Sequence, residues 1–456
     1  MKTYDVIVIG TGTAGQTAAF GLCDSDLTVA VIEQSGEPGG TCALHGCQPK
    51  KYFYEAAEAV ARCSHLKGRG ITKAPRASWQ DVLIAKNKFT KDIPETTADK
   101  LKNSGIDYYG GKARFTGPST LMAGEEEIRG RFIVIATGAE PVQLPVKGAQ
   151  QMITSNDFLA LQDLPRRIAF VGGGFISFEF AHFAARLGSR PGDIHILEAQ
   201  KQVLNPFDSG MVKQLVAASK AEGIVIHTEA ETREVEKKAD GFRVSLESGE
   251  NFEVDLVVNA AGRQPSIKHM NLEAGNIEYS KAGITVDNGM KTSSPGVFAV
   301  GDCTDSVKLA RVADMEAKTA VDAILNQVNG SKFSPMDYRV VPAVLFTYPQ
   351  LGMVGKTEDD LKQEQTPYRK SADTELNWPT YRRIGLRHGA YTILVGEDDR
   401  ILGAHFLCDS TTGLVNTFAQ AMRAGATVRD IYENHILAPY PSRESDILYM
   451  LSSLMK

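Results

Sequence analysis

The sequence lacks the features of a membrane protein or a nucleic-acid-binding protein. No apolar run approaches the roughly 20 residues that a transmembrane helix needs. The 50 basic and 55 acidic residues give a formal net charge of −5, and no basic block stands out. The N-terminal stretch MKTYDVIVIG does not fit a signal peptide, because Asp5 interrupts the apolar run and glycines follow it. We therefore expect a cytoplasmic protein with no membrane or nucleic-acid partner.

Cysteine is also scarce, yet two of the six cysteines lie close together. Cys42 and Cys47 are five positions apart in the stretch GGTCALHGCQPKK. The cytosol keeps thiols reduced, so a close pair there is expected to be catalytic or metal-binding rather than a structural disulfide. The other four have no neighbour in the sequence and are expected in the core: Cys23, Cys63, Cys303 and Cys408.

A glycine motif near the N-terminus predicts a dinucleotide site. A short apolar strand leads into Gly10-Thr-Gly12-Thr-Ala-Gly15, and a helical stretch follows. In this context the first glycine makes the turn, the second lets the backbone approach a pyrophosphate, and the third lets helix and strand pack closely. The next apolar strand ends at Glu33, where a carboxylate would accept hydrogen bonds from a ribose diol. A glycine turn in an unrelated α/β protein is the alternative interpretation.

The motif recurs in the middle of the chain. Another apolar strand leads into Gly172-Gly-Gly174-Phe-Ile-Ser177, and a second helical stretch follows. Serine replaces the third glycine and is small enough to keep the close packing. Two dinucleotide modules in one chain suggest that one cofactor stays bound while the other visits.

The second module is expected to prefer NADH. Its following strand ends in Glu198, which would bond the 2′-hydroxyl of NAD and repel the 2′-phosphate of NADP. Lys201 and Arg190 lie near Glu198 in the sequence, so NADPH stays open.

Three further apolar stretches end in glycine, as strands beside a nucleotide site do. Two of them match each other, and each could close one module. The third ends in an aspartate that would lie at the carboxyl edge of its strand and face a ligand. The residues at these ends are Thr137–Gly138, Gly262–Arg263 and Gly301–Asp302.

Taken together, the motifs resemble those of the FAD-dependent pyridine nucleotide–disulfide oxidoreductases, which include glutathione reductase, dihydrolipoyl dehydrogenase and mercuric reductase. The resemblance runs from about Tyr4 to about Leu451. The double lysine of GCQPKK is most similar to the glutathione reductase branch. The stretches that carry the resemblance are GTGTAG, GGTCALHGCQPKK, ATGAEP, GGGFISFEF, AAGRQP, TSSPGVFAVGDC and FTYPQLGMVGKTE.

The resemblance implies an α/β fold in three parts, in line with the two to three domains that 456 residues predict. Two Rossmann-like dinucleotide-binding domains would precede a C-terminal α+β domain through which family members form homodimers. The FAD-binding domain is expected to be split over residues 1–145 and 265–330. The NAD(P)-binding domain would span 146–264, and the dimerisation domain 335–456.

The resemblance also implies roles for single residues. Asp302 would contact the ribityl chain of FAD, and Lys51 would form an ion pair with Glu179 near the flavin ring. No resident metal is expected. Further cofactor contacts are expected, besides the glycines and acids already named, at Gly40, Thr41, Ala113, Thr137 and Arg263.

The cysteine pair is physically suited to redox chemistry. Five positions along a regular helix place two thiols poorly for a disulfide, whose Cα atoms lie about 4.4–6.8 Å apart. Gly46 before Cys47 and Pro49 after it make an irregular turn plausible. A helix N-terminus lowers a thiol pKa, and Lys50 and Lys51 add positive charge. A zinc half-site, which would need further ligands, and two inert buried thiols are the alternatives.

The resemblance assigns different roles to the two thiols. Cys47 would lie against the flavin, and Cys42 would face outward and attack the substrate. Electrons would then pass from NAD(P)H through FAD to Cys47, and from Cys42 to an acceptor. The expected activity is that of an NAD(P)H-dependent FAD disulfide oxidoreductase with a small disulfide or other sulfur acceptor.

The C-terminal segment departs from the family pattern. Disulfide reductases of the family have an acid–base histidine there, which acts in the partner subunit and is steadied by a glutamate five residues on. Here Tyr440 takes the histidine position, Ser445 takes the glutamate position, and Glu444 lies one place early. Tyrosine titrates near pH 10 rather than about 6.5, so ordinary disulfide exchange should be handicapped. His435 is a weaker candidate for the missing base.

Three functions therefore stay open. The first is reduction of a sulfur compound that does not need the usual base, although the first helix lacks the arginines common in glutathione reductases. The second is reduction of metal ions or quinones, because mercuric reductase is similar in having tyrosine at the Tyr440 position; the tail YMLSSLMK has no cysteine pair to deliver the metal. The third is a flavin-bearing redox sensor.

Overall fold

The computed structural model describes residues 1–188, 192–434 and 438–455 and consists of two compact units. The first unit comprises residues 1–51, 84–142 and 262–338. The second comprises residues 52–83, 143–261 and 339–456. The three-part division drawn from the sequence is finer than these units and stays a prediction.

The first unit is built on a seven-stranded sheet with a parallel centre. β1, β2, β3, β6 and β16 pair in parallel, whereas β4 and β5 pair antiparallel and extend the sheet beyond β6. A separate antiparallel pair joins β7 to β15. The strands are β1 (Lys2–Ile9), β2 (Val29–Glu33), β3 (Asp107–Gly110), β4 (Ala113–Gly117), β5 (Thr120–Ala123), β6 (Glu126–Ile135), β7 (Ala139–Pro141), β15 (Arg263–Pro265) and β16 (Val297–Ala299).

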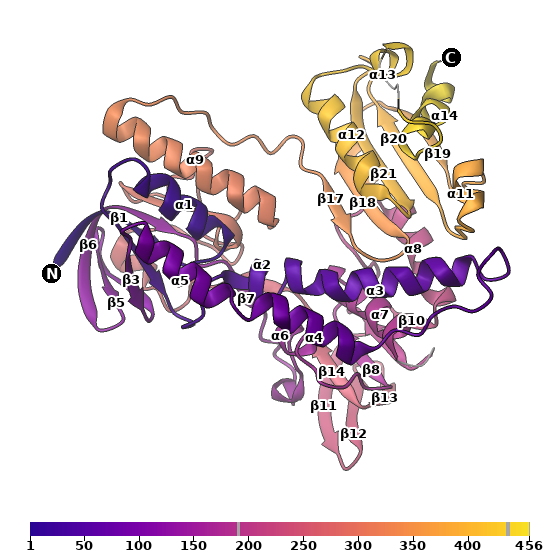
Figure 1. Cartoon of the computed structure of the whole chain (residues 1–456), viewed down its shortest axis with the longest axis horizontal. Coiled ribbons are helices and arrows are strands. Elements are labelled where there is room, and N and C mark those ends of the chain that lie inside the picture. The colour runs from indigo at the N-terminus through magenta and orange to yellow at the C-terminus, as the bar shows by residue number, and fades with distance from the viewer. Residues whose placement is uncertain (189–191, 435–437, 456) are drawn as a thin grey trace. The chain divides into compact units, whose positions relative to one another are not determined.

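Two helices pack side by side against this sheet. Figure 1 shows α1 (Thr13–Cys23) next to α9 (Ala310–Asn329), and their alanines share one buried core with the central strands. Small side chains at this contact let the two helices approach each other and the sheet closely. The other helical segments of this unit are α2 (Gly40–Leu44), α5 (Ile93–Asn103), η2 (Leu272–Gly275) and η3 (Gly301–Cys303).

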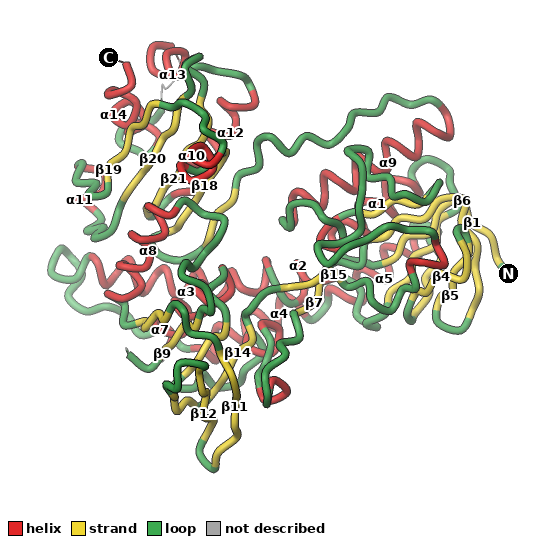
Figure 2. Tube along the Cα trace, turned by 180° about the vertical axis from the view of Figure 1, so that it is seen from behind, coloured by secondary structure: helices red, strands yellow, loops and turns green. Residues whose placement is uncertain are grey.

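The second unit contains three sheets. A parallel sheet has the order β10-β9-β8-β14, and a three-stranded antiparallel sheet has the order β11-β12-β13. A five-stranded antiparallel sheet has the order β17-β18-β21-β20-β19 (Figure 2). The first two sheets contain β8 (Ile168–Val171), β9 (Ile194–Leu197), β10 (Ile224–His227), β11 (Thr232–Lys238), β12 (Gly241–Leu246), β13 (Asn251–Val254) and β14 (Leu256–Asn259). The third contains β17 (Ala343–Leu345), β18 (Gln350–Gly355), β19 (Arg369–Asp373), β20 (Ala390–Val395) and β21 (Ile401–Cys408).

Helices cover these sheets, with α12 (Thr411–Arg423) packed on β18 and β21. Two helices, α3 (Cys47–His65) and α4 (Trp79–Thr90), begin in one unit and end in the other. The others are η1 (Ala149–Gln151), α6 (Ser155–Phe158), α7 (Phe175–Leu187), α8 (Ser209–Ala221), α10 (Glu358–Gln363), α11 (Pro379–Arg383), α13 (Val428–Asn434), η4 (Glu444–Asp446), α14 (Ile447–Leu451) and η5 (Ser452–Met455).

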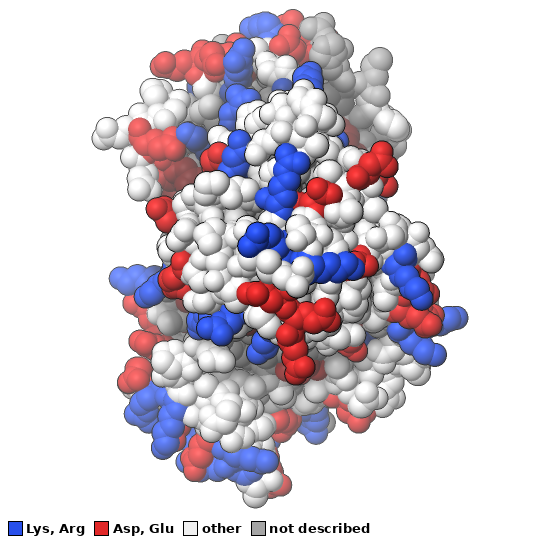
Figure 3. Space-filling model, turned by 90° about the vertical axis from the view of Figure 1, so that its left-hand side faces the viewer, with Lys and Arg blue, Asp and Glu red and all other residues white. Residues whose placement is uncertain are grey.

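The predicted α/β fold class is confirmed, with a parallel sheet in each unit and an antiparallel sheet near the C-terminus. On the face drawn in Figure 3, basic and acidic side chains are interspersed, as the near balance of the two charges predicts. Within the described residues, every helix is too short or too polar to cross a bilayer.

Candidate active site

The glycine turn of the first unit has no space for side chains. Gly10 has a φ of +108°, and a Cβ atom there would lie 2.4 Å from the carbonyl oxygen of Ala136. A Cβ atom on Gly15 would lie 2.0 Å from the carbonyl oxygen of Gly10. Glycine is therefore required at both positions, and it brings β1 directly into α1 as the motif predicted.

The N-terminus of α1 is suited to an anionic ligand. Gly12 caps the helix without a hydrogen bond from any described side chain, and no acidic residue lies in the first turn. The Gly40 backbone lies against Gly12, because a Cβ atom on Gly40 would be 2.4 Å from the Gly12 Cα. Thr41 follows and is exposed. Backbone N–H groups and the positive helix end would bind a pyrophosphate here.

Glu33 lies at the carboxyl end of β2, as predicted, but its oxygens are already engaged. Oε2 accepts hydrogen bonds from the Thr11 N–H at 3.1 Å and the Thr11 hydroxyl at 2.5 Å. Oε1 accepts from the Ser35 N–H at 2.8 Å and the Ser35 hydroxyl at 2.9 Å. A carboxylate offers about four acceptor positions. A ribose diol would therefore displace one of these hydroxyl groups, which the glycine motif alone did not indicate.

The second unit repeats the glycine turn. Gly172 has a φ of +107°, and a Cβ atom there would lie 2.6 Å from the carbonyl oxygen of Ala260. Gly174 caps α7. The hydroxyl of Ser177 donates to the Gly172 carbonyl at 2.5 Å, so serine at the third position adds a hydrogen bond that closes the turn.

Glu198 follows β9, and it accepts fewer hydrogen bonds at its carboxylate than Glu33 does. Its carboxylate accepts the N–H of Gly173 at 2.6 Å and the N–H of Gln200 at 2.8 Å. No other described residue donates to it, so about two acceptor positions remain for a ribose. Lys201 is exposed nearby in the sequence, and Arg190 lies outside the described residues.

The turn after β16 presents Asp302 at the edge of the first sheet. β16 runs parallel to β6, so Asp302 lies at the same strand edge as Thr137 and Gly138. Its half-buried carboxylate accepts no hydrogen bond from the described residues. Burial raises the pKa of this carboxyl group, and the positive charges of Arg263 and Lys308 oppose the rise. An unengaged acceptor in this position suits the hydroxyl groups of a ligand.

Arg263 interacts through its charge both with Asp302 at this edge of the sheet and with Cys47. Its guanidinium donates to the Ala139 carbonyl, and burial lowers its pKa against the negative charges of Asp302, Glu140 and Cys47. Two other predicted cofactor positions have structural contacts. Gly262 accepts the N–H of Val142 at 3.1 Å, and Ala113 is buried in the core at the start of β4.

A break between two helices separates the redox cysteines. Cys42 lies in α2, Cys47 is the first residue of α3, and His45 and Gly46 lie between the two helices. The Cys42 thiol lies close enough to the side chains of Cys47 and of Thr13, at the start of α1, for both to shift its pKa. The irregular turn predicted from the sequence is therefore confirmed, and it places the two thiols close together.

The two thiols differ in their surroundings. Cys47 is exposed, whereas Cys42 is half-buried. The neighbouring Cys47 raises the pKa of the Cys42 thiol, burial and the charge of Asp314 raise it further, and Thr13 opposes them. Two adjacent thiols cannot both ionise easily, because each thiolate disfavours the other. The lowered thiol pKa expected from the helix end concerned the turn at Cys47, and it stays a prediction.

The four other cysteines are free, but only two lie in the core. Cys303 and Cys408 are fully buried, and burial raises their pKa values to about 11 and about 12. Cys23 and Cys63 are half-buried, so the expectation of a core position is wrong for these two. Cys23 lies at the end of α1, where its thiol donates to the Ser104 carbonyl at 2.9 Å.

Lys51 and Glu179 lie in different units, so their expected ion pair stays a prediction. Glu179 is buried on α7 and accepts the N–H of Phe346 at 3.0 Å. Lys51 is half-buried in the first turns of α3.

In the segment around Tyr440, the polar side chains at the expected histidine and glutamate positions are not hydrogen-bonded to each other in the described structure. Tyr440 is 75% exposed. The hydroxyl of Ser445 donates to the Ser442 carbonyl at 2.7 Å, within its own turn. Glu444 lies close to Gly413, where an added Cβ atom would be 2.0 Å from its Oε1. His435, the other candidate base, lies outside the described residues.

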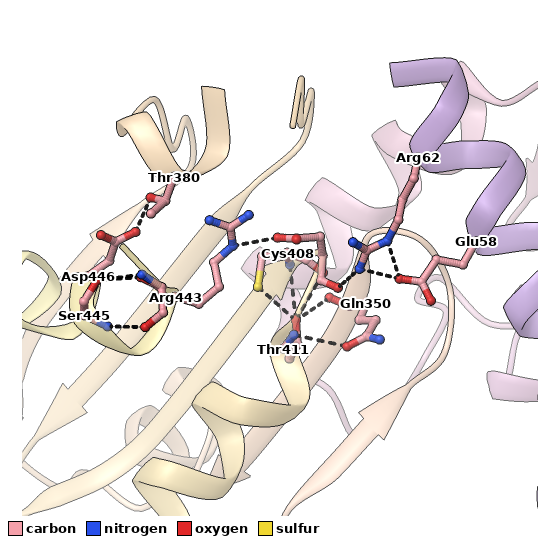
Figure 4. A network of polar contacts seen from close by, with 11 residues as sticks. Glu58, Arg62, Gln350, Thr380, Cys408, Thr411, Arg443, Ser445 and Asp446 are labelled. Atoms are coloured by element: carbon pink, nitrogen blue, oxygen red, sulfur yellow. Dashed lines mark hydrogen bonds and ion pairs between the residues drawn. The ribbon is translucent and has the colours of Figure 1, made fainter. Parts of the chain in front are cut away.

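A buried ion pair anchors this segment, and sequence reasoning missed it. Arg443, shown within its polar network in Figure 4, donates from Nε to Asp409 at 2.7 Å. Its guanidinium also stacks over the Tyr381 ring at 4.3 Å. Arg62 on α3 donates to the Asp409 carbonyl at 3.3 Å and to Glu58 at 2.8 Å. The network therefore joins α3 to the loop after β21 and to the Tyr440 segment.

The zinc alternative for the cysteines receives no support from side-chain clustering. Among the described residues, no three histidine, cysteine, aspartate or glutamate side chains gather closely enough to hold a metal ion. A structural zinc site needs four such ligands.

Comparisons with known proteins agree with this architecture. Residues 4–317 match the model of the pyridine nucleotide-disulphide oxidoreductases, and residues 341–446 match the dimerisation domain of the same family. The chain is 32% identical to a glutathione reductase of Burkholderia cepacia over 94% of both chains. It is 30% identical to dihydrolipoyl dehydrogenase 3 of Pseudomonas putida, over 97% of this chain and 96% of that one.

A solved structure also matches over the whole chain. The Cu(II) complex of the HOCl-induced flavoprotein disulfide reductase RclA from Escherichia coli superposes with a TM-score of 0.87, at 26% identity and over 100% of both chains. The chain therefore belongs to the pyridine nucleotide-disulphide oxidoreductase family and is an NAD(P)H-dependent FAD disulfide oxidoreductase of that family.

Proposed function

We propose that this enzyme uses NAD(P)H to reduce a small disulfide or other sulfur compound through Cys42 and Cys47. The observation that carries the proposal is the contact between the two thiols across the break between α2 and α3. In the overall reaction one NAD(P)H, one proton and one disulfide give NAD(P)⁺ and two thiols.

The first unit has residues that fit FAD. The N-terminus of α1, with Gly12 against Gly40, would hold the pyrophosphate. Glu33 would bind the ribose, and the unengaged carboxylate of Asp302 would accept hydrogen bonds from the ribityl chain. Bound FAD would supply the two-electron transfer from NAD(P)H to the cysteine pair.

The second unit would bind NAD(P)H, and we favour NADH. The glycine turn at Gly172 would hold the pyrophosphate. Glu198 keeps about two acceptor positions for the 2′- and 3′-hydroxyl groups, and its charge would repel a 2′-phosphate. The exposed Lys201 offers a positive charge that could bind the 2′-phosphate of NADPH. Turnover with NADH and with NADPH, compared under the same conditions, would show which nucleotide the enzyme prefers.

Cys42 is the proposed nucleophile. Its thiolate would attack one sulfur of the acceptor, so that a mixed disulfide forms and one thiol leaves. Cys47 would then attack the Cys42 sulfur, which restores the Cys42–Cys47 disulfide and releases the second thiol. The raised pKa of Cys42 means that its proton must be removed first. A phenol at the Tyr440 position can donate a hydrogen bond but is a poor base near neutral pH, so turnover should rise in alkaline solution.

Three finer parts of the proposal follow the family resemblance. Lys51 and Glu179 would form an ion pair near the flavin ring. The FAD, NAD(P) and dimerisation domains would have the boundaries expected from the sequence. The match of residues 341–446 to a dimerisation domain supports a homodimer, in which Tyr440 would lie near the cysteines of the partner subunit.

The test is Cys42→Ser in the FAD-loaded protein. We expect loss of disulfide reduction, whereas NADH should still bleach the flavin. Cys63→Ser is the matched control, because Cys63 is also a half-buried free thiol. Reduction of the acceptor at the wild-type rate by Cys42→Ser would contradict the proposed relay.

A second candidate is reduction of a metal ion such as Cu(II). Tyr440 at the histidine position favours it, because a metal acceptor needs no acid–base histidine. The related RclA structure was solved as a Cu(II) complex. Parallel assays with a disulfide, Cu(II) and a quinone would decide between these acceptors. Failure of all three, with a cysteine state that changes a partner's binding, would favour a redox sensor.

A further inference from the structure

A carboxylate is completely buried in the first unit, beside the turn that carries Asp302. Glu316 lies in the second turn of α9, and none of its surface is exposed. Its Oε2 accepts the N–H of Gly301 at 2.7 Å, and its Oε1 accepts the hydroxyl of Tyr338 at 2.6 Å. Burial raises the pKa of Glu316 and the negative charge of Asp302 adds to the rise, whereas the hydrogen bonds from Tyr338 and Gly301 oppose it. A buried acid held by two such donors is expensive for stability alone, because an apolar side chain would fill the space without desolvating a charge.

The bond from Glu316 fixes the turn that carries Asp302. Gly301 has a φ of +73°, and an added Cβ atom would lie 3.3 Å from the Ala313 Cβ on α9. The other side of the turn is held as well, since the Gly301 carbonyl accepts both the N–H and the hydroxyl of Thr304 at 2.9 Å. Both backbone polar groups of Gly301 are therefore hydrogen-bonded, and this holds the residue from which the chain continues into Asp302.

Tyr338 brings a distant part of the chain into this arrangement. It ends the strap, residues 331–338, in which Phe333 and Met336 pack against the same core as α1 and α9. Its hydroxyl reaches Glu316 across 22 positions of sequence. The strap, α9 and the turn are thus connected through one carboxylate.

We propose that Glu316 and Tyr338 are positioning residues for FAD: they hold the Gly301–Asp302 turn so that the Asp302 carboxylate is preset for the hydroxyl groups of the cofactor. The inference rests on the proposed role of Asp302. Neither residue touches the cofactor in this account, because both act through the turn. Preset acceptors raise affinity by removing the ordering that binding would otherwise require.

The test measures FAD affinity of the apoprotein by fluorescence, independently of turnover. Glu316→Leu leaves the Gly301 N–H unpaired and should weaken FAD binding about tenfold or more. Tyr338→Phe keeps the carboxylate and should weaken it a few-fold. Tyr4→Phe is the matched control, because Tyr4 also donates at 2.6 Å to an acid of the same unit and should leave the dissociation constant of FAD unchanged.

Two further variants separate the possible failures. Ile324→Val removes a methylene group from the same core on α9 and should lower the melting temperature without changing FAD affinity. If Glu316 had a merely structural role, Glu316→Leu would behave in the same way. Asp302→Asn tests the proposed role of Asp302 itself. If Asp302→Asn binds FAD normally, that role is wrong. If Asp302→Asn is weak but folded Glu316→Leu and Tyr338→Phe bind FAD like wild type, the positioning inference is overturned while the role of Asp302 stands.

Discussion

Replacing Arg443 by methionine should destabilise the second unit strongly. The side chains of Arg443 and Asp409 are only 10% and 7% exposed, and their ion pair is 2.7 Å long. Methionine fills much of the arginine volume but leaves the Asp409 carboxylate buried and without its cation. Breaking one partner of a buried pair costs about 3–5 kcal/mol. The stacking on the Tyr381 ring at 4.3 Å is lost as well.

An exposed pair of the same length provides the control. Arg243 and Glu253 are also 2.7 Å apart and lie in the same unit, but their side chains are 44% and 50% exposed. Exposed pairs contribute about 0–1 kcal/mol, so Arg243→Met should have a small effect. The two variants remove the same group from the same contact distance; they differ in the burial of the pair and in the stacking of Arg443 on Tyr381.

Urea unfolding followed by tryptophan fluorescence measures the difference. Both tryptophans of the chain, Trp79 and Trp378, lie in the second unit, so their emission follows its unfolding. With an m-value of about 3 kcal/mol/M, Arg443→Met should lower the midpoint by about 1 M or more, and Arg243→Met by less than about 0.4 M. Equal midpoints for the two variants would refute the argument from burial.

Two other predictions concern the thiols and the missing base. Cys47→Ala removes the largest cause of the raised Cys42 pKa, so alkylation of Cys42 by iodoacetamide at pH 7 should become about tenfold faster or more, and the midpoint of its pH dependence should move to lower pH. Peptide mass spectrometry at several pH values would measure the alkylation rate. A slower or unchanged rate would contradict the assigned cause. Tyr440→His combined with Ser445→Glu should raise disulfide reduction at pH 7 by about tenfold or more, since it supplies a base and its support. Wild-type turnover of the double variant at pH 7, with correct folding, would mean that proton transfer does not limit this enzyme.

Local chemistry explains what the sequence predicted well. The turns at Gly10 and Gly172 need glycine because a carbonyl oxygen occupies the Cβ position, so spacing alone located them. Gly46 and Pro49 likewise marked the break that brings Cys42 and Cys47 together. In each case a local steric or backbone requirement is visible in a short stretch of sequence.

Long-range polar contacts could not be predicted in this way. Arg443 and Asp409 are 34 positions apart, and no local sequence pattern around either residue predicts that they pair. The hydroxyl group of Thr11 reaches Glu33 across 22 positions, because the glycine turn and the end of β2 meet in space.

The corrections among the other cysteines have a simpler cause. Cys23 lies at the end of α1, and Cys63 lies near the end of α3. Helix ends reach the surface, so these thiols are only half-buried. Cys408 ends β21, Cys303 ends the short helix η3 that follows β16, and both are fully buried.

The central claim is that electrons from NAD(P)H reach the Cys42–Cys47 pair through FAD. An anaerobic titration of the FAD-loaded protein with NADH, followed by its visible spectrum, tests it most directly. We predict uptake of two equivalents of NADH per FAD, with a long-wavelength charge-transfer band after the first. Bleaching of the flavin by one equivalent, without that band, would contradict the claim and take the cysteine pair off the electron path.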